Sequence, residues 1–288
     1  MELKQSNRSQ SRIRLALQGP SGSGKTFSSL KVAFGICEDW RRIAIIDSEN
    51  GSANLYSHLG EYNVLNLNAP YSTERYIEAI DVCEKAGMDV IIIDSLSHNW
   101  EGNGGILHDH ANMAGNSFTN WSKLTPKMNT LVQKILTSNC HIISTIRSKQ
   151  DYVITENNGK SVPQKTGLKG IVREGTDYDY TIVMELDIYN NATCTKDRTQ
   201  LFNSRVPFKI DESVGEKIKN WCKDGEGYQT HELENMIRSC KTIEELNNLY
   251  KNQPHVRKLS AELNHRAAVI KGKVPEYEHL QNLNGQAV

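Results

Sequence analysis

A glycine-rich stretch near the start of the chain reads Gly19-Pro20-Ser21-Gly22-Ser23-Gly24-Lys25-Thr26. It matches the phosphate-loop pattern G-x-x-x-x-G-K-[ST], in which glycines let successive backbone N–H groups turn toward an anion. A strand pattern over 13–17 precedes the loop, and a helix pattern follows it. The positive end of the helix dipole would therefore lie beside the bound anion. In this motif the lysine, here Lys25, contacts the β- and γ-phosphates, and the hydroxyl of Thr26 ligates Mg²⁺. The sequence therefore predicts a nucleoside triphosphate site formed by this loop and the adjoining Phe27.

Short apolar runs alternate with helical patterns through the first two thirds of the chain. The runs are Ile13–Leu17, Arg42–Ile46, Tyr62–Leu67, Val90–Ile93, His141–Ile146, Tyr180–Leu186 and Thr199–Phe202. Several of them lack two-residue alternation, as strands buried on both faces of a parallel sheet do. The last runs follow one another without helices between them, which indicates antiparallel pairing. We predict an α/β fold of the P-loop nucleotide-hydrolase type, with a mostly parallel central sheet flanked by helices, antiparallel late strands and a small C-terminal helical module.

The composition and hydrophobic pattern of the sequence predict that the chain has three parts. Residues 1–11 are polar and are expected to form a flexible arm, and 12–224 are expected to form the nucleotide domain. Residues 225–288 carry helical signals only, including the capping box from Thr242 to Glu245, and are expected to form a helical module with a flexible end.

Composition sets few limits on partners. Lys and Arg together number 34, as do Asp and Glu, so any basic surface has to be local. The six cysteines are widely spaced, which favours a reducing cytoplasm and no zinc site. The first residues have no apolar core, so we expect neither a signal peptide nor a membrane partner. The triplet His108-Asp109-His110 has no third ligand at helical spacing, which favours a polar loop tip over a metal site.

Two of the apolar runs end in carboxylates. Asp94 ends the run that begins at Val90, where a carboxylate is expected beside the Mg²⁺ ligated by Thr26. Asp47 and Glu49 follow another run, one residue apart and therefore on one side of the chain. A carboxylate at this edge of a parallel sheet is suited to orient and partly deprotonate a water molecule beside the γ-phosphate. The alternative is that both acids face solvent in a loop.

The order of these parts resembles the ATPase core of RecA-like proteins over roughly Arg12–Ile210. It looks closest to the short RecA-like ATPases of bacteriophages and prophages, which act with single-stranded DNA and single-strand-binding protein in recombination or annealing. The resemblance implies ATP and Mg²⁺ as ligands, a bacterial cytoplasm as location, and a catalytic set of Glu49, Lys25 and Asp94. Thr145 stands where RecA carries a glutamine that senses the γ-phosphate. Because threonine has a shorter reach, Ser144 or Arg147 is an alternative sensor.

The triplet Lys196-Asp197-Arg198 lies between two of the late apolar runs. It resembles the pair of cations that hexameric and filamentous RecA-like ATPases insert into a neighbour's site. Two cations one residue apart on a strand point the same way, so both can meet the charge on a γ-phosphate. This pattern implies a homo-oligomer, a ring or a filament, with sites shared between subunits. A solvated turn is the alternative.

The segment from Arg147 to Arg173 is locally basic. Within it, residues 152–162 read as a β-hairpin with a tight Asn158-Gly159 turn. Its candidate contacts to DNA are Arg147, Lys149, Tyr152, Lys160, Lys165 and Lys169. In RecA-like proteins the loop after this strand faces DNA, whereas the alternative is packing on the next subunit. The stretch Ser97–Phe118 is predicted as a long connection near the same surface.

The leading hypothesis is an ATP hydrolase whose oligomer acts on single-stranded DNA in recombination, annealing or repair. Its C-terminal helices are a candidate docking module for a single-strand-binding or replication protein. The main alternative is a nucleotide-switched assembly or replication-loader factor with slow, DNA-independent hydrolysis. A small-molecule kinase is disfavoured by the run of late strands, and a GTPase by the lack of an N-K-x-D base reader. A replicative helicase remains open because of the K-x-R triplet.

Overall fold

The computed structural model describes Arg8 and residues 11–157, 160–202, 206–223, 230–253, 256–257 and 259–273, with the backbone alone for 150–168 and 230–232. Most of the N-terminal segment 1–11, which was predicted to be flexible, therefore lies outside the described residues, as does the chain end beyond residue 273. The chain divides into two compact units, one formed by Gln10–Cys222 and one that includes the residues from Lys223 onward.

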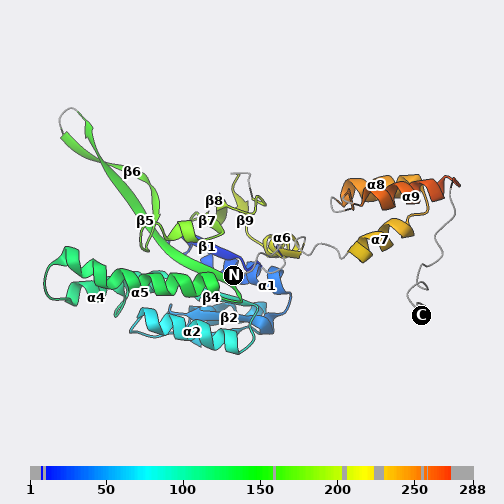
Figure 1. The fold of residues 1–288 in the computed structure, drawn as a ribbon. Helices are drawn as coiled ribbons and strands as arrows, with labels where there is room; N and C mark the ends of the chain where they lie inside the picture. The colour runs from blue at the N-terminus through cyan, green and yellow to red at the C-terminus, as the bar shows by residue number, and fades with distance from the viewer. Residues whose placement is uncertain are drawn as a thin grey trace, which may run out of the picture. The chain divides into compact units, whose positions relative to one another are not determined.

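The larger unit contains, in its described residues, a nine-stranded sheet (Figure 1). Along the sheet the order is β3-β2-β4-β5-β1-β7-β8-β9, and β6 pairs with β5 alone. The strands are β1 Arg14–Gly19, β2 Ile43–Asp47, β3 Asn63–Asn66, β4 Val90–Asp94, β5 His141–Asn157, β6 Lys160–Gly170, β7 Ile182–Leu186, β8 Asn191–Asp197 and β9 Phe208–Lys209. Pairing is parallel from β3 to β7 and antiparallel from β7 to β9. The predicted α/β fold with a mostly parallel sheet is confirmed.

Helices cover both faces of this sheet. The long helices are α1 Lys25–Cys37, α2 Thr73–Lys85, α5 Ser117–Thr137 and α6 Glu212–Lys223. Residues of α1 and α6 share one apolar cluster with one face of the sheet, and residues of α2 and α5 share a second cluster with the opposite face. Every residue of β2 and β4 is buried, which explains why these strands lack alternation in the sequence.

The stretch Ser97–Phe118, predicted as a long connection, instead contains the helices α3 Ser97–Glu101 and α4 Ile106–Asn112 and the start of α5. The prediction was wrong because tertiary contacts stabilise these short helices. Ile106 is buried against Leu124 and Met128 of α5. The ring of His110 stacks on Trp121, with 4.2 Å between the ring centres. Consequently His108-Asp109-His110 lies on a helix and not at a loop tip.

No strand forms at Thr199–Phe202 in the described structure, in contrast to the prediction from its apolar residues. The carboxylate of Asp197 accepts the backbone N–H groups of Thr199 and Phe202, both at 2.7 Å. These local bonds use donors that a neighbouring strand would need.

β5 continues beyond the sheet and forms a two-stranded arm with β6 (Figure 1). Parallel pairing with β1 ends at Arg147, opposite Gly19, and antiparallel pairing with β6 begins at the next residue, Ser148, opposite Gly170. At the other end Asn157 lies opposite Lys160, so the predicted hairpin pairing is confirmed, while the predicted Asn158-Gly159 turn lies outside the described residues. The arm is longer than predicted.

The C-terminal unit contains α7 Thr230–Ser239, α8 Ile243–Asn252 and α9 Ser260–Ile270. Ile237, Leu246 and Leu263, one from each helix, belong to its small apolar core. The predicted capping box is present, since Thr242 accepts the N–H of Glu245 and the Glu245 carboxylate accepts the N–H of Lys241. No helix among the described residues of the chain is long and apolar enough to cross a membrane.

Candidate active site

The phosphate loop joins β1 to α1 and adopts a shape that requires glycine at several positions. Gly22 and Gly24 have φ angles of 78° and 80°, in the left-handed region that other residues rarely adopt. A side chain at Gly24 would begin 2.9 Å from the Asn190 amide nitrogen, and one at Gly19 would begin 2.6 Å from the Leu186 carbonyl oxygen. The glycines therefore allow the loop to turn. They also allow the end of β7 and the turn that follows it to approach the loop closely.

Polar groups inside the loop are available to an anion. Lys25 Nζ donates to the carbonyl oxygens of Gly19 and Pro20, at 3.0 and 2.8 Å, so its side chain folds back over the loop. Burial lowers the pKa of Lys25, while the carboxylates of Asp94 and Glu49 act in the opposite direction. The hydroxyl of Ser23 is buried without a hydrogen-bond partner. A partly buried cation and an unpaired buried hydroxyl are the groups that a phosphate would satisfy.

Asp94 lies at the centre of the site and is 2% exposed. Its carboxylate accepts one hydrogen bond from the hydroxyl of Thr26 at 2.6 Å and another from the hydroxyl of Thr145 at 2.5 Å. Burial raises the pKa of Asp94, and the two hydroxyl bonds only partly oppose this effect. The end of β4, the first part of β5 and the start of α1 therefore bring together three residues predicted for the site.

This cluster fits Mg²⁺. A hydroxyl and a carboxylate are the oxygen ligands that this ion prefers, and it is usually bound through one or two carboxylates together with substrate phosphates. The described residues contain no group of three or more His, Cys, Asp or Glu side chains that would hold a metal ion by themselves. Thr26 and Asp94 thus remain the candidate ligands.

Asp47 and Glu49 have different surroundings. The Asp47 carboxylate accepts the N–H groups of Glu49 and Ala53, at 2.7 and 2.8 Å, and so holds the turn after β2. The Glu49 carboxylate is paired with Arg147, whose Nε lies 2.9 Å from Oε1 and whose Nη2 donates to Oε2. Burial alone would raise the pKa of Glu49, but the bonds from Arg147 outweigh it and hold that pKa below its ordinary value. Of the two acids, Glu49 is the one whose carboxylate acts on the pKa of Lys25.

A network that sequence reasoning missed connects the ends of β2 and β4. The hydroxyl of Ser48 accepts the N–H of Ser95 at 2.9 Å and lies 2.8 Å from Nδ1 of His98. Tyr76 donates from its hydroxyl to the Ser95 carbonyl oxygen at 2.9 Å. The repeated Asp-Ser ending of the two runs is the only signal of this network in the sequence.

Phe27 lies beside the loop at the start of α1 and is 37% exposed. Its ring contacts Tyr56 edge-on, with 5.8 Å between the ring centres, and Lys31 Nζ lies 5.5 Å from its centre. Tyr56 comes from the 3₁₀ helix η3 (Ser52–Leu59) and had no recognisable signal in the sequence.

Lys196 and Arg198 converge on one point, as expected for two cations one residue apart. Lys196 Nζ donates to the carbonyl oxygens of Asp177 and Tyr178, both at 2.7 Å, and Arg198 donates to the Tyr178 carbonyl oxygen at 3.0 Å. Both carbonyls belong to the 3₁₀ helix η4 (Thr176–Asp179). The two cations thus contact η4 of their own chain.

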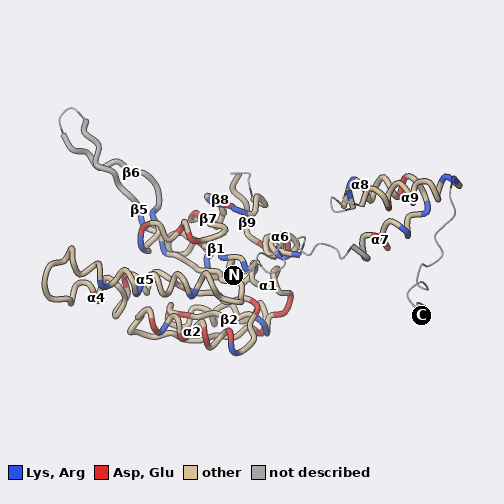
Figure 2. Tube along the Cα trace, in the orientation of Figure 1, with Lys and Arg blue, Asp and Glu red and all other residues tan. Residues whose placement is uncertain are grey.

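The candidate DNA contacts fall into three groups. Arg147 is paired with Glu49. Lys149 and Lys169 are exposed and lie opposite each other at the foot of the arm, where Figure 2 shows basic positions in blue. Lys169 also lies 3.5 Å from Glu174. The side chains of Tyr152, Lys160 and Lys165 lie outside the described part of the structure, although their backbones belong to the arm.

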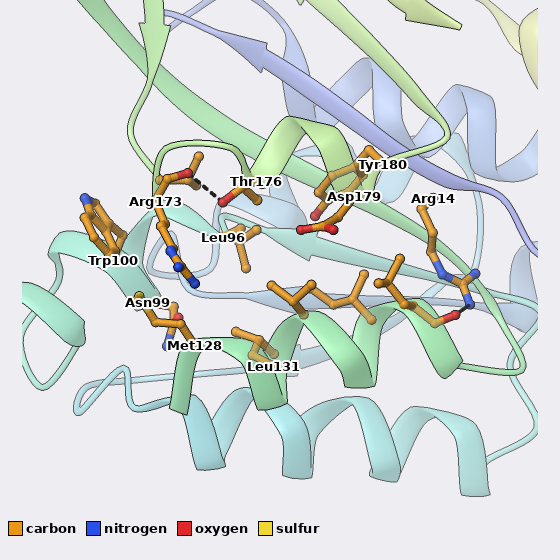
Figure 3. A pocket seen from close by; sticks show the side chains of 14 residues that line it. Arg14, Leu96, Asn99, Trp100, Met128, Leu131, Arg173, Thr176, Asp179 and Tyr180 are labelled. Atoms are coloured by element: carbon orange, nitrogen blue, oxygen red, sulfur yellow. Dashed lines mark hydrogen bonds between the residues drawn. The ribbon is translucent and has the colours of Figure 1, made fainter. Parts of the chain in front are cut away.

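A small cavity of about 50 Å³ lies elsewhere, between α5 and the segment that leads into β7 (Figure 3). Trp100, Met128 and Leu131 line it, together with Arg173 and Asp179. Its lining includes no residue of the phosphate loop, so it is separate from the site described above.

A family model described as AAA domain matches residues 11–205, which include the phosphate loop, Asp94, Glu49 and the arm. No curated protein matches the chain.

Proposed function

The chain belongs to the family of AAA domains, which are nucleotide-binding ATPases, and on this premise we propose that it is a phage-type, RecA-like ATP hydrolase acting on single-stranded DNA in recombination, annealing or repair. The observation that carries the proposal is the convergence of Thr26, Asp94 and Thr145 beside the phosphate loop. Glu49 and Lys25 complete the set of groups that hydrolysis requires.

The proposal gives each group a role. The phosphates lie against the backbone N–H groups of the loop and the ammonium of Lys25, and Phe27 borders the nucleotide. Mg²⁺, when held by Thr26 and Asp94, neutralises charge on the phosphate oxygens. Glu49 accepts a proton from water as the water oxygen bonds to the γ-phosphorus. The bond from that phosphorus to the bridging oxygen breaks, which leaves ADP and phosphate.

Action on DNA is supported by the arm. Two exposed lysines, Lys149 and Lys169, lie opposite each other at its foot, and two neighbouring cations suit a phosphate backbone. For a homo-oligomer, a ring or a filament, we propose that Lys196 and Arg198 leave η4 and enter a neighbour's site. The C-terminal helices are proposed to dock a single-strand-binding or replication protein.

A second candidate is a nucleotide-switched assembly or replication-loader factor with slow hydrolysis. The ion pair between Arg147 and Glu49 favours it, because a carboxylate with a depressed pKa is a weaker base. The two candidates differ in their response to DNA.

The deciding experiment measures steady-state ATP turnover with and without single-stranded DNA, with double-stranded DNA of equal phosphate concentration as the control. Stimulation by the single strand supports the recombination-type hydrolase. Slow turnover that no DNA changes would favour the loader.

A further inference from the structure

Arg147 occupies the junction between the sheet and the arm. It is the last residue of β5 that pairs with β1, and Ser148 is the first that pairs with β6. Its N–H donates to the hydroxyl of Ser97 at 2.9 Å, and its carbonyl oxygen accepts the N–H of Ile171 at 2.7 Å. The backbone of Arg147 is therefore hydrogen-bonded both to α3 and to the residue that follows β6. A displacement of β5 or β6 at the foot of the arm would therefore move Arg147.

The side chain of the same residue holds Glu49. Two parallel N–H···O bonds join the guanidinium to the carboxylate, an arrangement that fixes orientation as well as charge. The backbone of Glu49 is fixed in turn by its bond to Asp47. Both carboxylate oxygens thus already accept a donor, which leaves them less able to take a proton from water.

Other charged groups near this pair do not replace it. Lys25 donates to carbonyl oxygens of the phosphate loop, and burial lowers the pKa of His98, which favours its neutral form. Glu101 and Asp94 are the other acids that act on Arg147; Glu101 is exposed, and the Asp94 carboxylate accepts from two hydroxyls. Arg147 is consequently the cation that neutralises Glu49.

The guanidinium also remains within reach of other anions. The side chain of Arg147 is 39% exposed, whereas that of Glu49 is 23% exposed. Phosphate oxygens match the two-pronged geometry of arginine as well as carboxylates do. A phosphate at the foot of the arm therefore competes directly with Glu49 for the same donors.

We propose that Arg147 is a restraining residue, which holds Glu49 in an unproductive ion pair until a phosphate group takes over its guanidinium. This inference rests on the proposed function, because it concerns the base of that reaction. The phosphate comes from a polynucleotide on the arm. The competition between this phosphate and Glu49 converts DNA binding into a free carboxylate.

The test compares wild type, Arg147→Gln and Arg147→Lys in ATP turnover, with and without single-stranded DNA. Removal of the guanidinium is expected to raise the DNA-free kcat several-fold, and lysine, which bonds the carboxylate through one ammonium, should give an intermediate value. Stimulation by DNA is expected to disappear in Arg147→Gln while KM for ATP is unchanged. A raised KM together with persisting stimulation would indicate that the guanidinium serves the γ-phosphate of the bound nucleotide, and would overturn the restraint.

Arg41→Gln serves as the matched control. Arg41 also forms two bonds to one carboxylate, that of Asp39, but on an exposed surface after α1. It is expected to leave kcat, KM and stimulation unchanged. A DNA-free kcat that is unchanged or lower in Arg147→Gln, with a melting temperature like that of wild type, would overturn the restraint.

Failure of the broader proposal has a different signature. If wild type neither binds ATP in calorimetry nor hydrolyses it, the proposed function is wrong. If wild type binds and hydrolyses ATP but the Arg147 variants behave like wild type, the restraint alone is wrong. Should Arg147→Gln melt early, the graded response of Arg147→Lys decides the question.

Discussion

The hydroxyl of Thr26 lies 2.6 Å from the Oδ2 atom of Asp94, 68 positions later in the chain. This contact joins the end of the phosphate loop to the tip of β4. It brings a hydroxyl and a carboxylate, two ligands suited to Mg²⁺, onto the same side of the loop. The catalytic assignments for the neighbouring residues depend on this contact, and each of them leads to a measurable outcome.

Asp94→Asn is expected to abolish turnover while stabilising the metal-free protein. Burial raises the pKa of this carboxyl, so its ionised form opposes folding at pH values above the ordinary pKa of aspartate. The gain in melting temperature should be present at neutral pH without Mg²⁺. It should shrink as the pH falls below the raised pKa, because the wild-type carboxyl is then neutral as well. A loss of stability at neutral pH would contradict this account of Asp94.

Glu49→Gln is expected to bind ATP with little change while turnover falls by roughly 10²- to 10⁴-fold, the usual range for loss of a general base. Calorimetry measures the binding, and phosphate release measures the turnover. Glu61→Gln makes the same change at an exposed carboxylate and should behave like wild type. Unchanged hydrolysis in Glu49→Gln would remove Glu49 from the mechanism.

Gly24→Ala should weaken nucleotide binding and also lower stability by about 1–2 kcal/mol, the cost of the left-handed backbone for a residue with a side chain. The added methyl group also meets the amide of Asn190. Gly87→Ala is the matched control, because its φ is 76° and the space around it is open. It should cost similar stability, measured by denaturant unfolding, without loss of nucleotide affinity. Equal loss of affinity in both variants would argue against a specific role for the loop's shape.

Lys25→Ala and Arg198→Ala should each be nearly inactive alone, yet a mixture of the two should recover part of the turnover. Mixed oligomers contain some sites in which an intact phosphate loop meets an intact Arg198 from a neighbour. The measurement is a titration of one variant into the other at constant total protein. No recovery at any ratio would indicate a site that is completed within one chain.

The features that could be predicted from sequence are those whose physical cause is local. The glycines of the phosphate loop specify its turn, and the apolar runs specify strands that are buried on both faces. Asp94 could be assigned because a strand end after such a loop faces the same edge of the sheet. The capping box at Thr242 was recognised for the same reason.

The features that were missed depend on contacts between distant positions. The ion pair of Arg147 with Glu49, 98 positions earlier, has no local signal in the sequence. Helix α4 forms because Ile106 is buried against α5, and no local pattern announces that partner. The apolar residues of Thr199–Phe202 suggested a strand, whereas the side chain of Asp197 takes the backbone donors. In each case a tertiary contact outweighed the local preference.

The turn between β7 and β8 reaches back to the phosphate loop, since Asn190 donates to the carbonyl oxygen of Gly22, 168 positions earlier, at 3.3 Å. Together with the Leu186 carbonyl oxygen, the Asn190 side chain lies against one side of the phosphate loop. A fragment that stops before β7 would retain the whole sequence motif and lose these contacts. We therefore expect a fragment of this chain to need residues past Asn190 in order to hold a nucleotide.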